Sequence, residues 1–554
     1  MSRGTRNSGV DNSDRRSGAR ALVECLERSG VELVFGYPGG NVLSIFQELP
    51  AAKFRFVLAR HEQGCVHMAD GYARASGKVG VVLVTSGPGL TNTITGLGCA
   101  NMDGVPLVLI CGQVPLSDIG TDAFQEADTT GLTRSVSKHN FLVKSADEIP
   151  ETVAAAFYIA THGKPGPVVI DVPRDVQEAL TAAKYPERVS LRAYHPECSA
   201  LPSAVAQLAK RINAAKRPVI YAGGGVIAAD AAGDVRALAH KASIPVVTTL
   251  SGIGAIDSAD DFALGMGGIH GVPAAVQALK EADFILALGV RFNDRATGPL
   301  AERGSRAKTL ISPRAFLVHV DCDPAAIGKN VAVDLGINAD IKDLLTTVAS
   351  RIQSRDHREW LTALSAHREL PAYDGGGEGC MPQQIVDTLA ETTGGRCVLV
   401  TDVGQHQMFA ARRFPHSRPR HFITSAGMGA MGFGIPAAIG AAFAVGPSEP
   451  IVAILGDGGA QMTAEELIVA VEHKLPIVFV VFKNQTLGLV RQMCPGGAFA
   501  TELKSPDFVM LAKASGMKAF RIAKPADLAA GFKRALASRV PILVEVAVNP
   551  NANV

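Results

Sequence analysis

Residues 451–459 read Ile-Val-Ala-Ile-Leu-Gly-Asp-Gly-Gly, an apolar run that stops at glycines around Asp457. We predict that 451–455 form a buried strand, because the run is short, apolar and bounded by glycine. An amphipathic stretch at 462–474 and a second apolar run at 476–482 come next. Strand, helix and strand in this order form a right-handed crossover with parallel strands. The stretch therefore predicts an α/β fold with a parallel sheet.

Two polar residues follow these strands, Asp457 after the first and Asn484 after the second. Open parallel sheets bind ligands outside the carboxyl ends of their strands. Mg²⁺ is commonly held by one or two carboxylates, neutral oxygens and phosphates, and glycine lets backbone approach a phosphate closely. We therefore predict a Mg²⁺-held diphosphate beside Gly458 and Gly459, with Asp457, the Asn484 amide and the Thr486 carbonyl as metal ligands. A polar strand end followed by an ordinary turn is the alternative interpretation.

The composition excludes several classes of protein. A length of 554 residues predicts about three or four domains of ~150 residues. The 54 basic and 52 acidic residues nearly balance, so we expect neither nucleic acid nor a membrane surface as a partner. The nine cysteines include no CxxC pair, which favours reduced thiols in a cytoplasmic protein. No run of uncharged apolar residues is long enough for a membrane span, and polar residues 1–17 are expected to form a disordered arm.

Apolar runs alternate with helical stretches along three segments, which predicts three tandem doubly wound parallel-sheet domains. The segments are expected at 18–180, 197–348 and 380–554. In the first, strands are predicted at 54–59, 79–84, 107–111 and 168–172. A proline- and charge-bearing linker at 181–202 and a glycine- and charge-rich connector at 357–379 separate the segments.

Glu62 is the second chemical landmark, because it follows the apolar run 54–59 and begins a stretch of helical periodicity. A carboxylate at a helix N-terminus gains ~0.3–1 kcal/mol from the helix dipole, which is a purely structural explanation. The Gly-Asp-Gly and Asn layout, however, resembles the thiamine diphosphate (ThDP) signature, and ThDP needs one carboxyl group for proton exchange with its aminopyrimidine ring. Turns at Pro38-Gly39-Gly40 and Gly87-Pro88-Gly89 are expected to be walls of the same cleft.

Longer motifs are similar to those of the acetohydroxyacid synthase (acetolactate synthase) large catalytic subunits, over about residues 18–549. The motifs include Phe35-Gly36-Tyr37-Pro38-Gly39-Gly40, Arg60-His61-Glu62-Gln63-Gly64, Gly120-Thr121-Asp122-Ala123-Phe124-Gln125-Glu126, Gly289-Val290-Arg291-Phe292-Asn293-Asp294-Arg295 and Gly404-Gln405-His406-Gln407-Met408. The resemblance implies domains that bind the pyrimidine, FAD and the diphosphate. It also implies a homodimer or homotetramer, because the carboxylate and the diphosphate site of one cofactor come from different subunits, and a small regulatory subunit as a further partner.

The resemblance also implies residue roles. Glu62 would activate the cofactor, Gln125 and Phe124 would lie near the reacting ketoacid, and Arg295 would clamp the carboxylate of the second ketoacid. The implied ThDP neighbours are Pro38, Gly39, Val403, Gly404, Gln405, His406, Gly429, Met431, Gly458, Gly459, Leu487, Gly488 and Leu489. The implied FAD neighbours are Lys164, Gly223, Gly224, Gly225, His270, Gly289, Arg291, Asp321 and Asp340.

The activity implied is decarboxylation of pyruvate and ligation of the remaining two-carbon unit to pyruvate or 2-ketobutyrate, in branched-chain amino acid biosynthesis, with no net redox role for FAD. Met493 stands where the family usually has Trp, and Lys483 and Asn293 also depart from its pattern. The acceptor preference is therefore open. Two alternatives stay open as well: a ThDP-dependent 2-ketoacid decarboxylase or lyase, and a non-catalytic flavin- or nucleotide-binding protein.

Overall fold

The computed structural model describes residues 15–299, 306, 308–370, 378–494 and 499–554. They form two compact units, of which the first contains residues up to 70 and 78–195, and the second contains residues 71–77 and 196–554. Within the described residues there are three six-stranded sheets, one in the first unit and two in the second. Every strand pairing in these sheets is parallel. The predicted class of three parallel-sheet α/β domains is confirmed.

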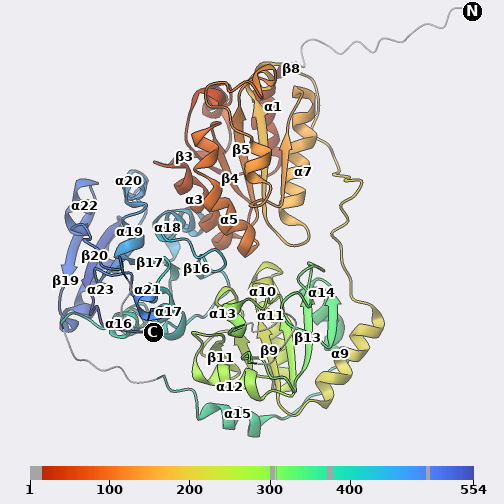
Figure 1. The fold of residues 1–554 in the computed structure, drawn as a ribbon, viewed down its shortest axis with the longest axis vertical. Helices are drawn as coiled ribbons and strands as arrows, with labels where there is room; N and C mark the ends of the chain where they lie inside the picture. The colour runs from red at the N-terminus through yellow and green to blue at the C-terminus, as the bar shows by residue number, and fades with distance from the viewer. Residues whose placement is uncertain (1–14, 300–305, 307, 371–377, 495–498) are drawn as a thin grey trace, which may run out of the picture. The chain divides into compact units, whose positions relative to one another are not determined.

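The sheet of the first unit has the order β3-β2-β4-β5-β7-β6 (Figure 1). Its strands are β2 (Leu33–Gly36), β3 (Arg55–Leu58), β4 (Gly80–Val84), β5 (Leu107–Gln113), β6 (His139–Leu142) and β7 (Pro167–Pro173). The main helices are α1 (Gly18–Arg28), α2 (Leu43–Glu48), α3 (Glu62–Ser76), α5 (Ile94–Asp103) and α7 (Ile149–Thr161). Apolar residues of α1 and α7 share one buried cluster with alternate residues of β4, β5 and β7, so these helices cover one face of the sheet.

The central sheet has the order β11-β10-β9-β12-β13-β14. Its strands are β9 (Pro218–Ala222), β10 (Val246–Thr248), β11 (Ala263–Met266), β12 (Phe284–Leu288), β13 (Phe316–Asp321) and β14 (Leu335–Asn338). The helices are α9 (Pro202–Ala214), α10 (Gly224–Ala228), α11 (Ala232–Ala242), α12 (Pro273–Glu281), α13 (Asp294–Thr297), α14 (Ile341–Ala349) and α15 (Arg358–Ser365). Along β12, Leu286 and Leu288 join one cluster while Ile285 and Ala287 join another. Both faces of this sheet are therefore buried, which explains its continuous apolar strands.

The third sheet has the order β16-β15-β17-β18-β20-β19. Its strands are β15 (Val398–Thr401), β16 (Phe422–Thr424), β17 (Ile451–Gly456), β18 (Ile477–Lys483), β19 (Lys518–Ile522) and β20 (Ile542–Ala547). The helices are α16 (Pro382–Thr393), α17 (Gln405–Arg413), α18 (Gly434–Val445), α19 (Asp457–Ala460), α20 (Leu467–Glu472), α21 (Gly488–Met493), α22 (Phe508–Ala514) and α23 (Leu528–Leu536). β17 pairs directly with β18 in parallel, from Ile451 opposite Ile477 to Gly456 opposite Phe482. The predicted unit of two parallel strands around Asp457 is thus confirmed.

The ends of the predicted helix at 462–474 differ from the structure. A 3₁₀ turn (Ala464–Glu466) precedes α20, which ends at Glu472. The Thr463 hydroxyl donates to the Gly432 carbonyl over 2.9 Å, and this tertiary bond holds the entry to the helix. Lys474 has a left-handed φ of 53°, which ends the helical path.

Two predicted irregular segments contain regular structure. The prediction of a disordered arm at 1–17 is wrong for its last residues, because Arg16–Ser17 form β1 and pair antiparallel with β8 (Leu180–Thr181). Residues 1–14 lie outside the described residues. The connector expected at 357–379 contains α15, whose Trp360 is buried and donates to the Pro218 carbonyl over 3.2 Å. Burial of one large aromatic side chain explains why α15 packs on the central sheet; residues 371–377 of the connector lie outside the described residues.

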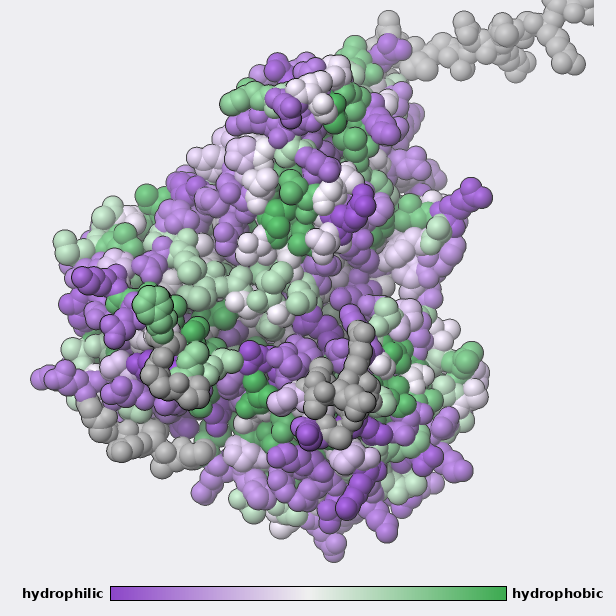
Figure 2. Space-filling model, in the orientation of Figure 1, coloured by the Kyte–Doolittle hydropathy of each residue, from purple (hydrophilic) through white to green (hydrophobic). Residues whose placement is uncertain are grey.

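No helix among the described residues has both the length and the apolar character needed to cross a membrane. Figure 2 shows hydrophilic side chains over most of the visible face, with apolar ones in scattered groups. Two described aromatic side chains are almost fully exposed, Phe124 at 87% and Phe499 at 101%.

Candidate functional site

Asp457 lies directly after β17, as the first residue of α19, and is only 2% exposed. Its Oδ1 accepts a hydrogen bond from the Gly458 amide at 3.0 Å. Its Oδ2 accepts from the Gln485 amide at 2.8 Å and from the Ser505 hydroxyl at 2.5 Å. Burial raises the pKa of this carboxyl, while the hydroxyl and amide donors act in the opposite direction. A cation beside Asp457 would compensate for the loss of water around the carboxylate.

The loop after β18 carries the other two predicted metal ligands. The Thr486 amide donates to Asn484 Oδ1 over 3.1 Å, and Gln485 between them has a left-handed φ of 56°. The Gln485 amide is the group that bonds Asp457. The structure therefore brings Asp457, Asn484 and Thr486 into one cluster at the carboxyl edge of the sheet. The Thr486 hydroxyl oxygen is buried there and has no hydrogen-bond partner among the described residues.

Small residues around His406 leave the backbone close to its ring. A Cβ on Gly404 or Gly456 would lie 2.9 or 2.8 Å from His406 Cε1, so any larger residue would displace the ring. Burial lowers the pKa of His406 to about 4, which makes the ring neutral. His406 Nε2 is buried, and no group in the part of the chain that the structure describes forms a hydrogen bond with it. Such an orphaned polar atom fits a polar ligand at this edge of the sheet.

Asp402 is a site residue that the sequence argument did not single out. It follows β15, is fully buried, and accepts hydrogen bonds from the amides of Val403 at 2.7 Å, Gly432 at 3.1 Å and Gly434 at 2.9 Å. Burial raises its pKa to about 6. Asp402 thus joins the 403–406 and 429–434 segments, both of which contain predicted ThDP neighbours. The sequence signal that could have identified Asp402 is its position directly after an apolar run that forms a strand.

The Gln405 side chain has a structural task. Its Nε2 donates to Gln492 Oε1 at 2.9 Å and to the Ala552 carbonyl at 3.0 Å. A Cβ on Gly488 would lie 2.0 Å from Gln405 Oε1, so glycine is required where α21 begins. The contact between Gln405 and Gly488 places Leu487, Gly488 and Leu489 beside the start of α17. Nearby, a Cβ on Gly458 would lie 3.0 Å from Met431 Cε and 3.1 Å from Leu487 Cδ2, so these predicted ThDP neighbours share one cradle.

Glu62 begins α3 in the first unit, as predicted, and is partly buried. Asn92 Nδ2 donates to Glu62 Oε2 over 2.9 Å. A Cβ on Gly89 would lie 3.8 Å from Glu62 Oε1, and one on Gly39 would lie 2.4 Å from Thr85 Cγ2. The two predicted glycine turns therefore do lie at the same edge of the sheet as Glu62, with Pro38 next to Gly39 in the first of them.

Gln125 and Phe124 lie on a loop that is held by packing against Gly87 and by a hydrogen bond to Ala127. Gln125 has a left-handed φ of 62°, and a Cβ on Gly87 would lie 3.0 Å from its Cα. Further along, Gln113 Nε2 donates to the Ala127 carbonyl at 2.9 Å and to Asp171 Oδ2 at 3.1 Å. Burial raises the pKa of Asp171 to about 7. The loop is thus packed on the glycine turn, whereas the Phe124 side chain is exposed.

The predicted FAD neighbours of the central sheet fall at two places. Gly223 is the N-cap of α10, which begins with Gly224 and Gly225. A Cβ on Gly223 would lie 2.1 Å from the Gly289 carbonyl, so the turns after β9 and β12 touch. Asp321 ends β13, while Asp340 caps α14 by accepting the Asp343 amide at 3.0 Å. Asp340 therefore has a structural role in the helix it caps.

The remaining predicted residues lie on other segments of the chain. The Ile269 amide, next to His270, donates to the Arg295 carbonyl over 3.0 Å, and burial and then the charge of Arg295 lower the pKa of His270. The Arg295 guanidinium is half-exposed and 3.6 Å from Asp294. The Arg291 carbonyl accepts from Asn330 at 3.0 Å. Lys164 lies in the first unit, between α7 and β7.

Three family models match the chain. They are "Thiamine pyrophosphate enzyme, N-terminal TPP binding domain" at residues 16–132, the "central domain" at 205–348 and the "C-terminal TPP binding domain" at 402–546. Each contains one of the parallel sheets or most of it. The fold and the matches together define a thiamine pyrophosphate enzyme of three domains.

Curated relatives narrow this class. A "Probable acetolactate synthase large subunit" of Methanocaldococcus jannaschii is 42% identical, over 96% of this chain and 92% of its own length. The "Acetolactate synthase isozyme 3 large subunit" of Escherichia coli is 42% identical, over 94% of this chain and 92% of its own length. An "Acetolactate synthase large subunit" of Corynebacterium glutamicum is 40% identical, over 98% and 88%. The chain belongs to the acetolactate synthase large-subunit family.

Proposed function

We propose that this chain catalyses the decarboxylation of pyruvate and ligates the remaining two-carbon unit to a second 2-ketoacid, in branched-chain amino acid biosynthesis. One observation carries the proposal furthest. The buried Asp457 carboxylate lies with Asn484 and Thr486 at the carboxyl edge of a TPP-binding sheet, in a chain about 40% identical to acetolactate synthases over nearly its whole length.

We propose Mg²⁺ as the ion of this cluster, held by the Asp457 carboxylate, the Asn484 amide oxygen and the Thr486 carbonyl. The donor set supports a hard cation, because all three groups offer oxygen. Val403, Gly404, His406, Gly429 and Met431 would then line bound ThDP, together with Gly458 and Gly459. Bound ThDP supplies an electron sink for the carbon that loses CO₂.

The chain's own groups would perform the remaining tasks. The Glu62 carboxyl, held by Asn92, would exchange a proton with the aminopyrimidine ring. Glu62 and Asp457 belong to different units, so the fold of each unit is compatible with a cofactor shared between two copies of the chain. We propose that they meet across a homodimer interface. Gln125 would lie at the ketoacid, and the Arg295 guanidinium would hold the acceptor carboxylate through paired hydrogen bonds.

FAD and a small subunit complete the proposal. The touching glycine turns at Gly223–Gly225 and Gly289 lie at the carboxyl edge of the central sheet, where such sheets bind ligands, which supports a dinucleotide there. Its flavin would have no net redox role. The relatives are named large subunits, which supports a small regulatory subunit as a partner.

The test is product analysis of the purified protein with pyruvate, ThDP and Mg²⁺, with and without FAD and with competing 2-ketobutyrate. We expect acetolactate and acetohydroxybutyrate, formed only when ThDP and Mg²⁺ are both present. Release of CO₂ with free acetaldehyde instead would contradict carboligation and identify a decarboxylase. Turnover unchanged after removal of Mg²⁺ by a chelator would contradict the metal site.

A further inference from the structure

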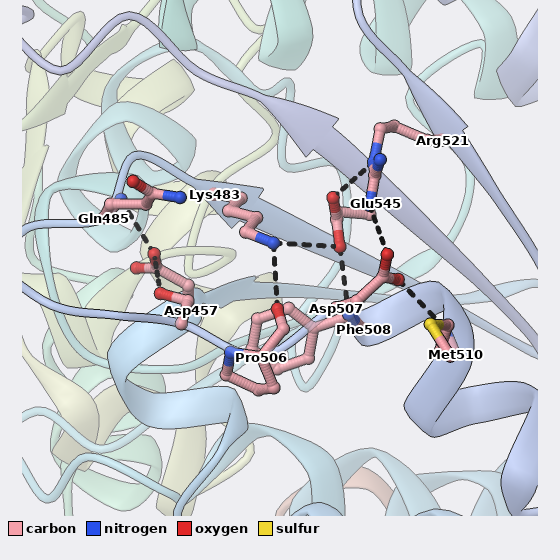
Figure 3. A network of polar contacts seen from close by, with 10 residues as sticks. Asp457, Lys483, Gln485, Pro506, Asp507, Phe508, Met510, Arg521 and Glu545 are labelled. Atoms are coloured by element: carbon pink, nitrogen blue, oxygen red, sulfur yellow. Dashed lines mark hydrogen bonds and ion pairs between the residues drawn. The ribbon is translucent and has the colours of Figure 1, made fainter.

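An ionic network built around a buried carboxylate lies next to the predicted metal cluster (Figure 3). At its centre is Glu545 of β20, whose side chain is only 3% exposed. Glu545 Oε1 accepts from Arg521 Nε at 2.6 Å, and Glu545 Oε2 lies 3.5 Å from Lys483 Nζ. Lys483 ends β18 and immediately precedes Asn484. Breaking an ion pair of a buried carboxylate is costly, because the buried charge then loses part of its compensation.

The network holds the four residues 505–508, which we name the 505–508 segment. Lys483 Nζ donates to the Pro506 carbonyl at 2.8 Å. Arg521 Nη2 donates to Asp507 Oδ2 at 2.9 Å, and the Phe508 amide donates to Glu545 Oε2 at 3.0 Å. Three consecutive residues of a connecting segment are therefore fixed by partners from three different strands.

The remaining residue of the 505–508 segment, Ser505, contacts the predicted metal cluster instead of the ionic network. The Ser505 hydroxyl donates to Asp457 Oδ2 over 2.5 Å, and Figure 3 places the Asp457 carboxylate near Gln485 at one end of the network. With the Gln485 amide on the same oxygen, this bond limits the rotation of the carboxylate. Partners that orient a metal ligand in this way typically change metal affinity when they are lost.

We infer that Lys483 and Ser505 are positioning residues for the metal ligand Asp457: Lys483 and Glu545 fix the Pro506 carbonyl, and the adjacent Ser505 then holds the Asp457 carboxylate. This inference rests on the proposed Mg²⁺ site. Neither residue touches the metal or the substrate in this arrangement. Their effect passes through the 505–508 segment, so it should appear first in the affinity for the ion.

The experiment measures the dissociation constant of Mg²⁺ by calorimetry, on the full chain in the presence of saturating ThDP. Ser505→Ala should weaken Mg²⁺ binding by about 10- to 100-fold, and Lys483→Met should weaken it by a similar factor. Lys483→Arg should restore most of the affinity, because a guanidinium also donates to a carbonyl and a carboxylate. Lys504→Met is the matched control: Lys504 is exposed and adjacent to Ser505, and its loss should leave the affinity unchanged.

The double variant Lys483→Met/Ser505→Ala separates a positioning role from general loss of structure. If Lys483 acts through Ser505, the double variant should bind Mg²⁺ about as weakly as either single variant. The inference would be overturned if the loss of Mg²⁺ affinity in the double variant equalled the product of the two single losses, or if Lys483→Met bound Mg²⁺ with unchanged affinity. If Lys483→Met does not fold, Lys483→Gln is measured in its place, with the same expectations.

Failure of the proposed metal site is distinguishable from failure of this inference. Wild-type protein that binds no Mg²⁺ with ThDP present, or Asp457→Asn that binds it normally, would remove the metal site itself. Normal binding by the wild type with no effect of the two positioning variants would remove only the roles of Lys483 and Ser505.

Discussion

The Asn92 carboxamide donates to Oε2 of Glu62 over 2.9 Å. This bond orients the carboxyl group at the first residue of α3, on the sheet edge that also carries the Gly87–Gly89 turn. A side-chain amide on one carboxylate oxygen leaves the other available for a ring nitrogen. The geometry therefore supports proton exchange by Glu62 and makes a direct prediction.

Glu62→Gln should bind ThDP normally but turn over pyruvate about 10²–10⁴-fold more slowly, because an amide cannot exchange the proton. Gln keeps an oxygen that can accept from Asn92, so the fold of the loop should persist. ThDP binding by calorimetry and pyruvate consumption check the two parts. Glu151→Gln is the control, since Glu151 is also in the first turn of a helix, α7, and is exposed. Near-normal turnover in Glu62→Gln would remove Glu62 from this role.

Asp457→Asn should lose Mg²⁺-dependent ThDP binding, because a neutral amide replaces the only charged ligand of the proposed set. The loss should exceed the about 10- to 100-fold typical of residues that merely touch a ligand. Titration with Mg²⁺ at fixed ThDP measures it. Asp527→Asn is the control, because the Asp527 carboxylate is exposed and lies in the same domain; this variant should bind ThDP as the wild type does. Wild-type binding by Asp457→Asn would contradict the role of Asp457 as a metal ligand.

Arg295→Ala should keep CO₂ release from pyruvate but form about 10- to 100-fold less acetolactate, because a charge-assisted pair of hydrogen bonds to the acceptor is lost. Parallel assays of CO₂, acetaldehyde and acetolactate check this. Arg314→Ala, at an exposed position of the same domain, is the control. An equal fall of all products would mean that Arg295 supports the fold or the first ketoacid.

Asp171→Asn should change the pH dependence of stability. Burial raises the pKa of Asp171 from 3.8 to about 7 in the folded protein, so folding favours the protonated form. Its contribution is fully present below about pH 4 and is lost as the pH rises through 7. The Tm of wild type minus that of Asp171→Asn should therefore fall between pH 4 and 7 and then level off. A difference that stays constant from pH 4 to 8 would contradict the raised pKa.

Trp360→Ala should destabilise the central domain by about 3–5 kcal/mol, because it empties a buried site on the sheet and removes the bond from Nε1 to the Pro218 carbonyl. Scanning calorimetry should show that the central domain of Trp360→Ala unfolds at a lower temperature than that of the wild type. Trp360→Phe keeps most of the packing and loses the hydrogen bond, so it should cost only about 1 kcal/mol. Equal transitions in all three proteins would mean that α15 contributes no stability to the central sheet.

Local patterns were sufficient for the two strands around Asp457 and for the residues at their ends, but they missed β2 and β6 of the first sheet. Asp457 and Asn484 follow apolar runs that could only be buried strands, and parallel pairing then brings their carboxyl ends together. The same reasoning found Glu62 at the start of α3. It was less reliable where tertiary contacts decide order: Trp360 orders part of a charged connector, and the Thr463 bond to Gly432 displaces the start of a helix.

Taken by itself, the sequence determined the class of sheet and the residues that strand ends present, because period, glycine and charge act within a few residues of one another. Only the tertiary structure decided which distant groups orient them. Asp402 reaches Gly432 and Gly434, and Ser505 reaches Asp457, across separations of tens of residues. No local pattern encodes such contacts. They arise when buried carboxylates, removed from water, bond the donors that the packed strands bring within reach.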